Sequence, residues 1–85
     1  MKITIDHPSS SYGQPVILDD AGEVMDYAAG IKAARAKLGL TVAALGEKLG
    51  VSGRTVQGWE SGRMPETSAL NMLGKLLRDA EALQK

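Results

Sequence analysis

The 85-residue sequence contains no cysteine and no phenylalanine, and it carries no net charge at neutral pH. Without cysteine the chain can form neither a disulfide nor a thiolate metal site, which is compatible with a reducing cytoplasm. No apolar run reaches the length of a membrane span or a secretory signal, so we expect no membrane partner. Aromatic residues are limited to Tyr12, Tyr27 and Trp59. The length and this composition predict one small domain with an aliphatic core.

The zero net charge hides an uneven distribution along the chain. Residues 1–26 carry one basic side chain against five acidic ones, a net charge of −4. Residues 27–63 carry six basic side chains against two acidic ones, a net charge of +4, and the remainder is neutral. Such asymmetry is typical of a segment that contacts nucleic acid, but small domains also scatter charge by chance. The distribution therefore supports nucleic-acid binding only beside an independent motif.

Residues 41–62 predict two short helices joined by a tight turn. Thr41 is suited to cap a first helix over residues 41–49, because its hydroxyl can accept a backbone N–H that the helix leaves unpaired. Gly50 can supply the left-handed conformation at the end of that helix. Ser52 is suited to cap a second helix, which Gly62 ends.

Small and apolar residues fit the same arrangement. Val56 and Trp59 lie three residues apart and predict the inner face of the second helix. Gly46 lies one turn before Gly50, where minimal size lets the second helix approach the first. This is the helix-turn-helix arrangement, in which the second helix enters the DNA major groove.

Over residues 30–77 the sequence resembles the Cro and C1-type (XRE-family) helix-turn-helix proteins, especially small phage regulators and the DNA-binding antitoxins of toxin–antitoxin operons. The matching residues are Arg35, Leu38, Gly39, Leu40, Thr41, Leu45, Leu49, Gly50, Val51, Ser52, Thr55, Val56, Trp59, Glu60, Gly62, Arg63 and Pro65. Two positions depart from the family pattern, which usually has glutamine in place of Val42 and alanine in place of Gly46. The resemblance also implies an ion pair between Arg35 and Glu60.

The expected fold is mainly α, a four- to five-helix repressor-like DNA-binding domain with a short N-terminal β-hairpin arm. We expect an N-terminal extension over residues 1–26 and the helix-turn-helix domain over residues 27–85. Asp26 can cap a helix over residues 27–38, which Gly39 closes. A last helix is expected over residues 66–83.

The N-terminal extension and the last helix each leave a question open. Ile3 and Ile5 alternate with polar residues, a weak strand signal, and residues 14–25 predict a hairpin with Gly22 at positive φ. The extension is either a lid on the helical core or an arm that adds a strand to a second copy. On the last helix, one apolar stripe fits the core, and a second predicts a dimer surface. The residues of that second stripe are Met72, Leu76 and Leu83.

The resemblance implies that the early second helix contacts DNA. Among the positions that matching proteins use for base contacts, Arg54 can hold guanine O6 and N7, and Gln57 can pair with adenine. Arg63, the hydroxyl of Thr55 and the helix N-termini near Thr41 and Ser52 are phosphate candidates. The full predicted DNA-binding set is Thr41, Ser52, Gly53, Arg54, Thr55, Gln57, Gly58 and Arg63.

These observations predict a sequence-specific, double-stranded DNA-binding transcriptional regulator, a repressor of phage or antitoxin type, acting as a homodimer in the cytoplasm. An antitoxin would also bind a toxin protein. We expect no enzymatic activity, cofactor or metal, because His7 precedes a proline in a predicted loop and no nucleophile is organised around it. The alternative is a protein-interaction module with weak or no DNA binding. Neutral net charge, Val42, Gly53 and Gly58 favour that alternative.

Overall fold

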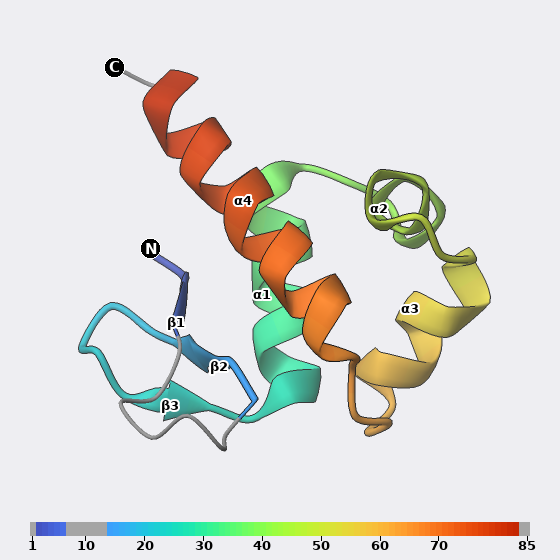
Figure 1. Ribbon diagram of the computed structural model, residues 1–85, viewed down its shortest axis with the longest axis horizontal. Helices are drawn as coiled ribbons and strands as arrows, with labels where there is room; N and C mark the ends of the chain where they lie inside the picture. Colours follow the sequence, from blue (N-terminus) through green and yellow to red (C-terminus); the bar gives the residue numbers. More distant parts are fainter. Residues whose placement is uncertain (1, 7–13, 84–85) are drawn as a thin grey trace.

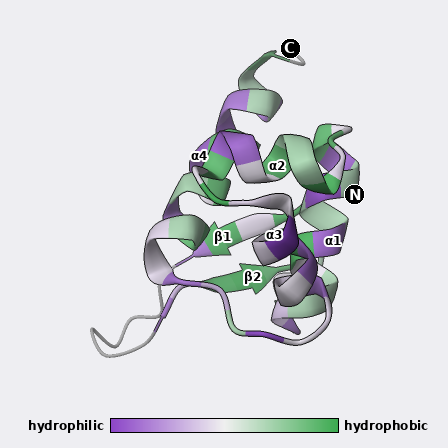
Figure 2. Cartoon of the chain, turned by 90° about the vertical axis from the view of Figure 1, so that its right-hand side faces the viewer, coloured by the Kyte–Doolittle hydropathy of each residue, from purple (hydrophilic) through white to green (hydrophobic). Residues whose placement is uncertain are grey.

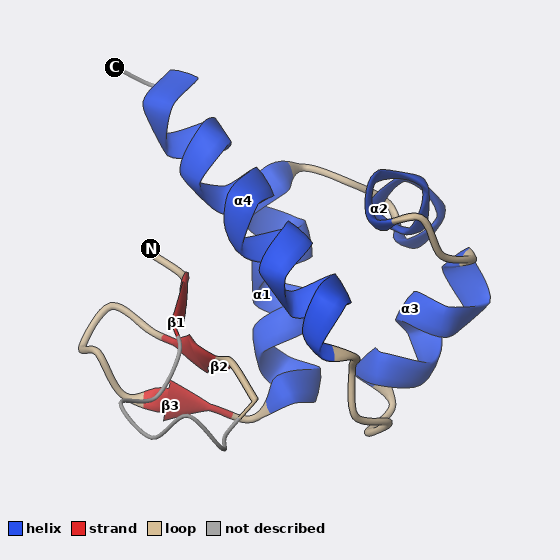
Figure 3. Cartoon of the chain, in the orientation of Figure 1, coloured by secondary structure: helices blue, strands red, loops and turns tan. Residues whose placement is uncertain are grey.

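The computed structural model describes residues 2–6 and 14–83, in which a small antiparallel sheet is followed by four helices (Figures 1 and 3). The strands are β1 (Thr4–Asp6), β2 (Val16–Leu18) and β3 (Val24–Met25). The helices are α1 (Tyr27–Leu38), α2 (Val42–Leu49), α3 (Gly53–Glu60) and α4 (Thr67–Leu83). The expected class, mainly α with a short N-terminal hairpin, is confirmed. The predicted loop around His7 lies outside the described residues.

The hairpin is formed by β2 and β3, and its turn is held by one carboxylate. Asp19 Oδ1 accepts hydrogen bonds from the backbone N–H groups of Ala21 at 2.9 Å and Glu23 at 3.0 Å. Gly22 adopts φ +78°, the positive value expected at this turn. β1 joins the other side of β2, so the strand order is β1-β2-β3 and all pairs are antiparallel.

The sheet lies against α1 and α4 (Figure 1). Ile3 and Ile17 are almost fully buried and belong to the same core cluster as the helical residues. A Cβ atom added to Gly30 would lie only 2.7 Å from Ile17 Cδ1, so α1 presents bare backbone where β2 approaches it. Gly74 of α4 likewise lets β1 approach closely, since a Cβ atom added there would lie 3.1 Å from the Cβ of Ile5. The sheet thus covers one side of the helices as a lid does.

Local capping chemistry explains where α1 begins and ends. The Asp26 side chain accepts a hydrogen bond from the backbone N–H of Ala29, and Gly39 closes the helix at φ +70°. The predicted helix over residues 27–38 is confirmed at both ends. α4 begins one residue later than expected, at Thr67. Its buried positions complete the helical core: Ala69, Leu70, Leu73 and Leu77.

Candidate nucleic-acid interface

The helix-turn-helix of α2 and α3 is built from the predicted caps. Thr41 Oγ1 accepts a hydrogen bond from the Ala44 N–H at 3.1 Å, and Ser52 Oγ accepts one from the Thr55 N–H at 3.1 Å. Gly50 ends α2 at φ +76°. Both cap residues, Thr41 and Ser52, are exposed, and the backbone N–H groups that directly follow each cap lack intrahelical partners.

Two glycines bring α2, the turn and the start of α3 into close contact. A Cβ atom at Gly46 would lie 2.7 Å from the carbonyl oxygen of Val51, and one at Gly53 would lie 3.2 Å from Ala43 Cα. These are backbone atoms, which cannot move without displacing a helix. The two absent side chains therefore fix how α3 crosses α2. They also place the N-terminus of α2 beside that of α3.

The inner face of α3 is anchored in the core. Val56 is fully buried and Trp59 is only 2% exposed. This confirms the prediction that the single tryptophan faces inward. The opposite face of the helix is consequently turned to solvent. In Figure 2, where α3 faces the viewer, that helix is mostly hydrophilic or neutral, whereas α2 is largely hydrophobic.

An ion pair ties the end of α3 to α1. Arg35 Nε donates to Glu60 Oε2 at 2.8 Å and its Nη2 donates to Oε1 at 3.2 Å. The Nη1 of the same guanidinium donates to the carbonyl of Leu40 at 3.2 Å, between α1 and α2. Hydrogen bonding to the carboxylate raises the pKa of Arg35 above its ordinary value, against the opposing effect of burial. The pairing implied by the family resemblance is thus confirmed, and it orients α3 against α1 and α2.

The outer face of α3 presents polar side chains at helical spacing. Arg54, Gln57 and Ser61 are exposed, and Gly58 is half-buried. Positions separated by three, four and seven residues share one face of a helix, so these four residues form one surface. Ser61 was not among the predicted contacts. Its spacing of seven from Arg54 is the signal that could have identified it.

Arg63 folds back across this surface. Its backbone N–H donates to the carbonyl of Gly58 at 2.9 Å. A Cβ atom at Gly58 would lie 3.8 Å from Arg63 Cδ and 3.9 Å from its Nε, so the arginine side chain lies alongside the glycine. The arginine therefore joins the outer face of α3 although it follows the helix in the chain.

The outer face carries two uncommitted cations. Within residues 2–6 and 14–83, the guanidinium groups of Arg54 and Arg63 form no hydrogen bond or ion pair. By contrast, the Thr55 hydroxyl is engaged with the cap, 2.9 Å from Ser52 Oγ. The surface can therefore offer two guanidinium groups, one carboxamide and two helix N-termini to an anionic ligand.

The described part of the chain lacks two other features. It contains no group of three or more His, Asp or Glu side chains placed to hold a metal ion. None of its helices combines the length and apolar character needed to cross a bilayer.

Comparison with known proteins identifies the family to which the chain belongs. A family model described as helix-turn-helix matches residues 31–78, more than half of the chain. The match includes all of α2 and α3 and leaves the N-terminal sheet outside. No curated protein and no solved structure matches the chain. From the matched segment and the geometry above, the chain belongs to the Cro/C1-type (XRE) helix-turn-helix family of DNA-binding regulators.

Proposed function

We propose that the protein is a sequence-specific transcriptional repressor that inserts α3 into the major groove of double-stranded DNA. The observation that carries this proposal is the two-sided character of α3. Val56 and Trp59 fix the helix inward, while Arg54 and Gln57 project outward and Arg63 crosses the same face. A rigid helix with uncommitted donors on its outer face is what base readout requires.

The residues divide between base contact and positioning. Arg54 lies in the first turn of α3, where its guanidinium can hold O6 and N7 of guanine, and Gln57 can pair with adenine one turn later. In this proposal, Arg63 and the N–H groups that follow Thr41 and Ser52 hold phosphates, which set the register of the helix. The Thr55 hydroxyl lies 2.9 Å from Ser52 Oγ and keeps capacity for a further contact to DNA.

A repressor of this kind works as a homodimer. Two copies present their recognition helices about 34 Å apart to a two-fold related operator, and the bound dimer occludes a promoter. It does so in the cytoplasm, where its DNA lies, and without a cofactor or a catalytic step. In the antitoxin form of the proposal, a toxin protein is a further partner. In the phage form there is none.

The alternative is an interaction module with weak or no DNA binding, which the neutral net charge, Val42, Gly53 and Gly58 favour. Two of these residues have a packing role, because Val42 packs against the core and Gly53 lies against Ala43. A Cβ at Gly58 would make only ordinary contact with Arg63. Val42 and Gly53 therefore need no loss of DNA contact to explain them.

The test is selection of a preferred duplex from a random pool, followed by affinity measurements at two salt concentrations. We expect affinity to fall steeply with salt, because phosphate binding releases counterions. Arg54→Ala should weaken binding to the preferred site by about 1–3 kcal/mol, roughly 5- to 150-fold. The matched control is Lys32→Ala on α1, an exposed cation outside the predicted DNA-binding set. Equal losses in both variants, or binding indifferent to salt, would contradict the proposal.

A further inference from the structure

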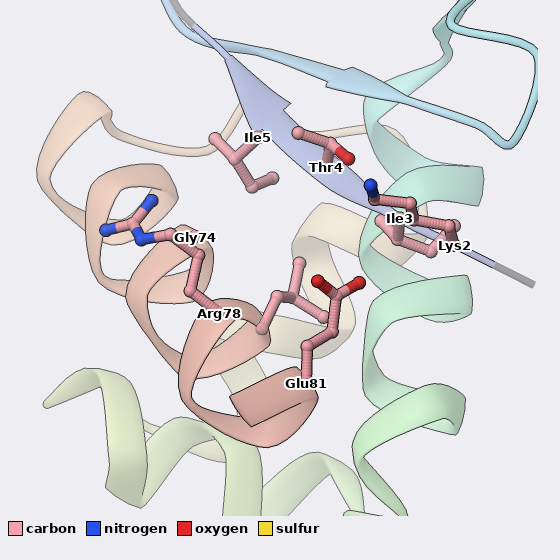
Figure 4. Close-up of a pocket in the computed structure, with 8 residues that line it drawn as sticks. Lys2, Ile3, Thr4, Ile5, Gly74, Arg78 and Glu81 are labelled. Atoms are coloured by element: carbon pink, nitrogen blue, oxygen red, sulfur yellow. The ribbon is translucent and has the colours of Figure 1, made fainter. Parts of the chain in front are cut away.

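Within the described residues, the outer edge of β1 has no strand partner. Among the described strands, β1 pairs only with β2, because the order is β1-β2-β3. Residues 2–5 all line a cavity of about 230 Å³ that β1 shares with α4, where Gly74, Leu77, Arg78 and Glu81 form its other wall (Figure 4). Successive residues of a strand point to opposite faces. A cavity bordered by all of them must therefore run along the edge of the strand.

The backbone groups that point out of this edge can be assigned. The Lys2 N–H donates to the carboxylate of Asp20, which follows β2 in the register that pairs Thr4 with Leu18. The ladder gives the same direction, toward β2: Asp19 N–H donates to the Glu23 carbonyl, so Ile17 faces β3, and Leu18 faces Thr4, which is two residues from Lys2. Backbone groups alternate in direction along a strand, so the N–H and C=O groups of Ile3 and Ile5 point the other way. These are the groups that another strand would pair with.

We propose that this edge pairs with the same edge of a second copy, antiparallel, about a two-fold axis that passes through Thr4. The segment from Lys2 to Asp6 has the same chemistry from either end: a charge, isoleucine, threonine, isoleucine and the opposite charge. In the proposed register, Lys2 lies opposite the partner's Asp6. Ile3 lies opposite the partner's Ile5, and Thr4 lies opposite its own copy.

This register satisfies the geometry of an antiparallel ladder. Ile3 and the partner's Ile5 both direct their backbone groups across the edge, so they form a hydrogen-bonded pair, and symmetry supplies a second. Lys2 and Asp6 are exposed while Ile3 is buried, so the charges meet on the solvent face and the isoleucines stay on the core face. Opposite charges, paired threonines and paired β-branched residues are all favourable across strands.

The charges select this register and this occupant. An axis through Ile3 or Ile5 would keep the backbone directions. The first would set Lys2 opposite the partner's Thr4 and the second would set Asp6 opposite it, so both ion pairs would be lost in either case. An unrelated strand would meet the edge without this match, whereas a second copy carries its own complement. The pairing forms without DNA, so it can be tested separately from the proposed repressor activity.

The first experiment is charge exchange, read by sedimentation equilibrium in the absence of DNA. Lys2→Asp places two aspartates opposite each other, and Asp6→Lys does the same with lysines, so each should raise the dimer dissociation constant at least tenfold. The double variant Lys2→Asp/Asp6→Lys restores opposite charges and should recover dimerisation. Lys32→Asp, at an exposed position on α1, is the matched control and should leave dimerisation unchanged. Failure of the double variant to recover would overturn the proposal.

The second experiment is a disulfide at the axis. The chain has no cysteine, so Thr4→Cys introduces a single thiol. Residues facing each other at a non-hydrogen-bonded antiparallel position have Cα atoms about 4.5 Å apart, within disulfide range. Oxidation should convert the variant to covalent dimer, whereas Glu23→Cys, in the exposed turn of the hairpin, should stay largely uncrosslinked. A monomeric wild type would overturn the proposal. A second pair of results would also overturn it: the Thr4→Cys variant stays uncrosslinked, and Leu83→Glu on α4 dissociates the dimer. Together they would place the dimer contact on α4 instead of β1.

Discussion

Removing the charge of Glu60 tests the ion pair that holds α3 against α1. Glu60→Gln keeps the size of the side chain but leaves the guanidinium of Arg35 without its counter-charge. The carboxylate receives two hydrogen bonds from this arginine, at 2.8 and 3.2 Å. The Arg35 and Glu60 side chains are 24% and 10% exposed, so solvent can compensate the stranded charge only in part.

The expected cost lies between two limits. Exposed ion pairs contribute about 0–1 kcal/mol, whereas breaking a buried pair costs about 3–5 kcal/mol. The partial burial here places the loss at about 2 kcal/mol in the free energy of unfolding. For a domain of this size, that corresponds to a fall in Tm of roughly 8–16 °C.

The assay is urea and thermal unfolding of a double-mutant cycle. Glu60→Leu and Arg35→Met should each destabilise the protein, and the double variant should cost less than the two singles together by at least about 1 kcal/mol. The pKa of Arg35 is raised, so its contribution to the free energy of unfolding is lost only when the pH rises through that pKa. This contribution should therefore not vary around neutral pH. A loss under about 0.5 kcal/mol for Glu60→Gln, or strict additivity in the cycle, would refute the reasoning.

Three further variants probe other contacts. Gly30→Ala should destabilise the fold by about 1 kcal/mol net, because overpacking against Ile17 outweighs the helix preference of alanine. In chemical unfolding, Gly30→Ala should cost less stability in an Ile17→Val background than in the wild type. Ser52→Ala removes the cap of α3 and should cost about 1 kcal/mol in the same assay, whereas Ser68→Ala at an exposed position on α4 should cost little. Arg63→Ala should weaken binding to all duplexes alike and lower the salt slope by about 1 in titrations, and a change of preferred sequence would contradict its phosphate role.

Much of the helical part could be predicted because its determinants are local. Asp26, Thr41 and Ser52 cap their own helices, so the sequence around each residue is enough to place a helix start. The inward direction of Trp59 followed from its spacing to Val56. The hairpin turn was also local, because Asp19 and Gly22 act within a few residues.

Contacts between distant segments could not be predicted in the same way. Gly53 was assigned to DNA contact, yet its lack of a side chain also serves packing against Ala43, which depends on how two helices cross. The position of Arg63 over Gly58 depends on the path of the chain after α3. The pairing of β1 with β2 is equally non-local, and Ile3 and Ile5 alone gave only a weak strand signal.

The most direct test of the DNA-reading face is an NMR titration of the labelled protein with a selected duplex. Backbone amide shifts should concentrate at residues 41–43, 52–58, 61 and 63. The amides of β2 and β3, on the other side of the core, should change little. Shifts confined to the sheet, or an unchanged spectrum of α3 at saturating duplex, would contradict the assignment of α3 as the recognition helix.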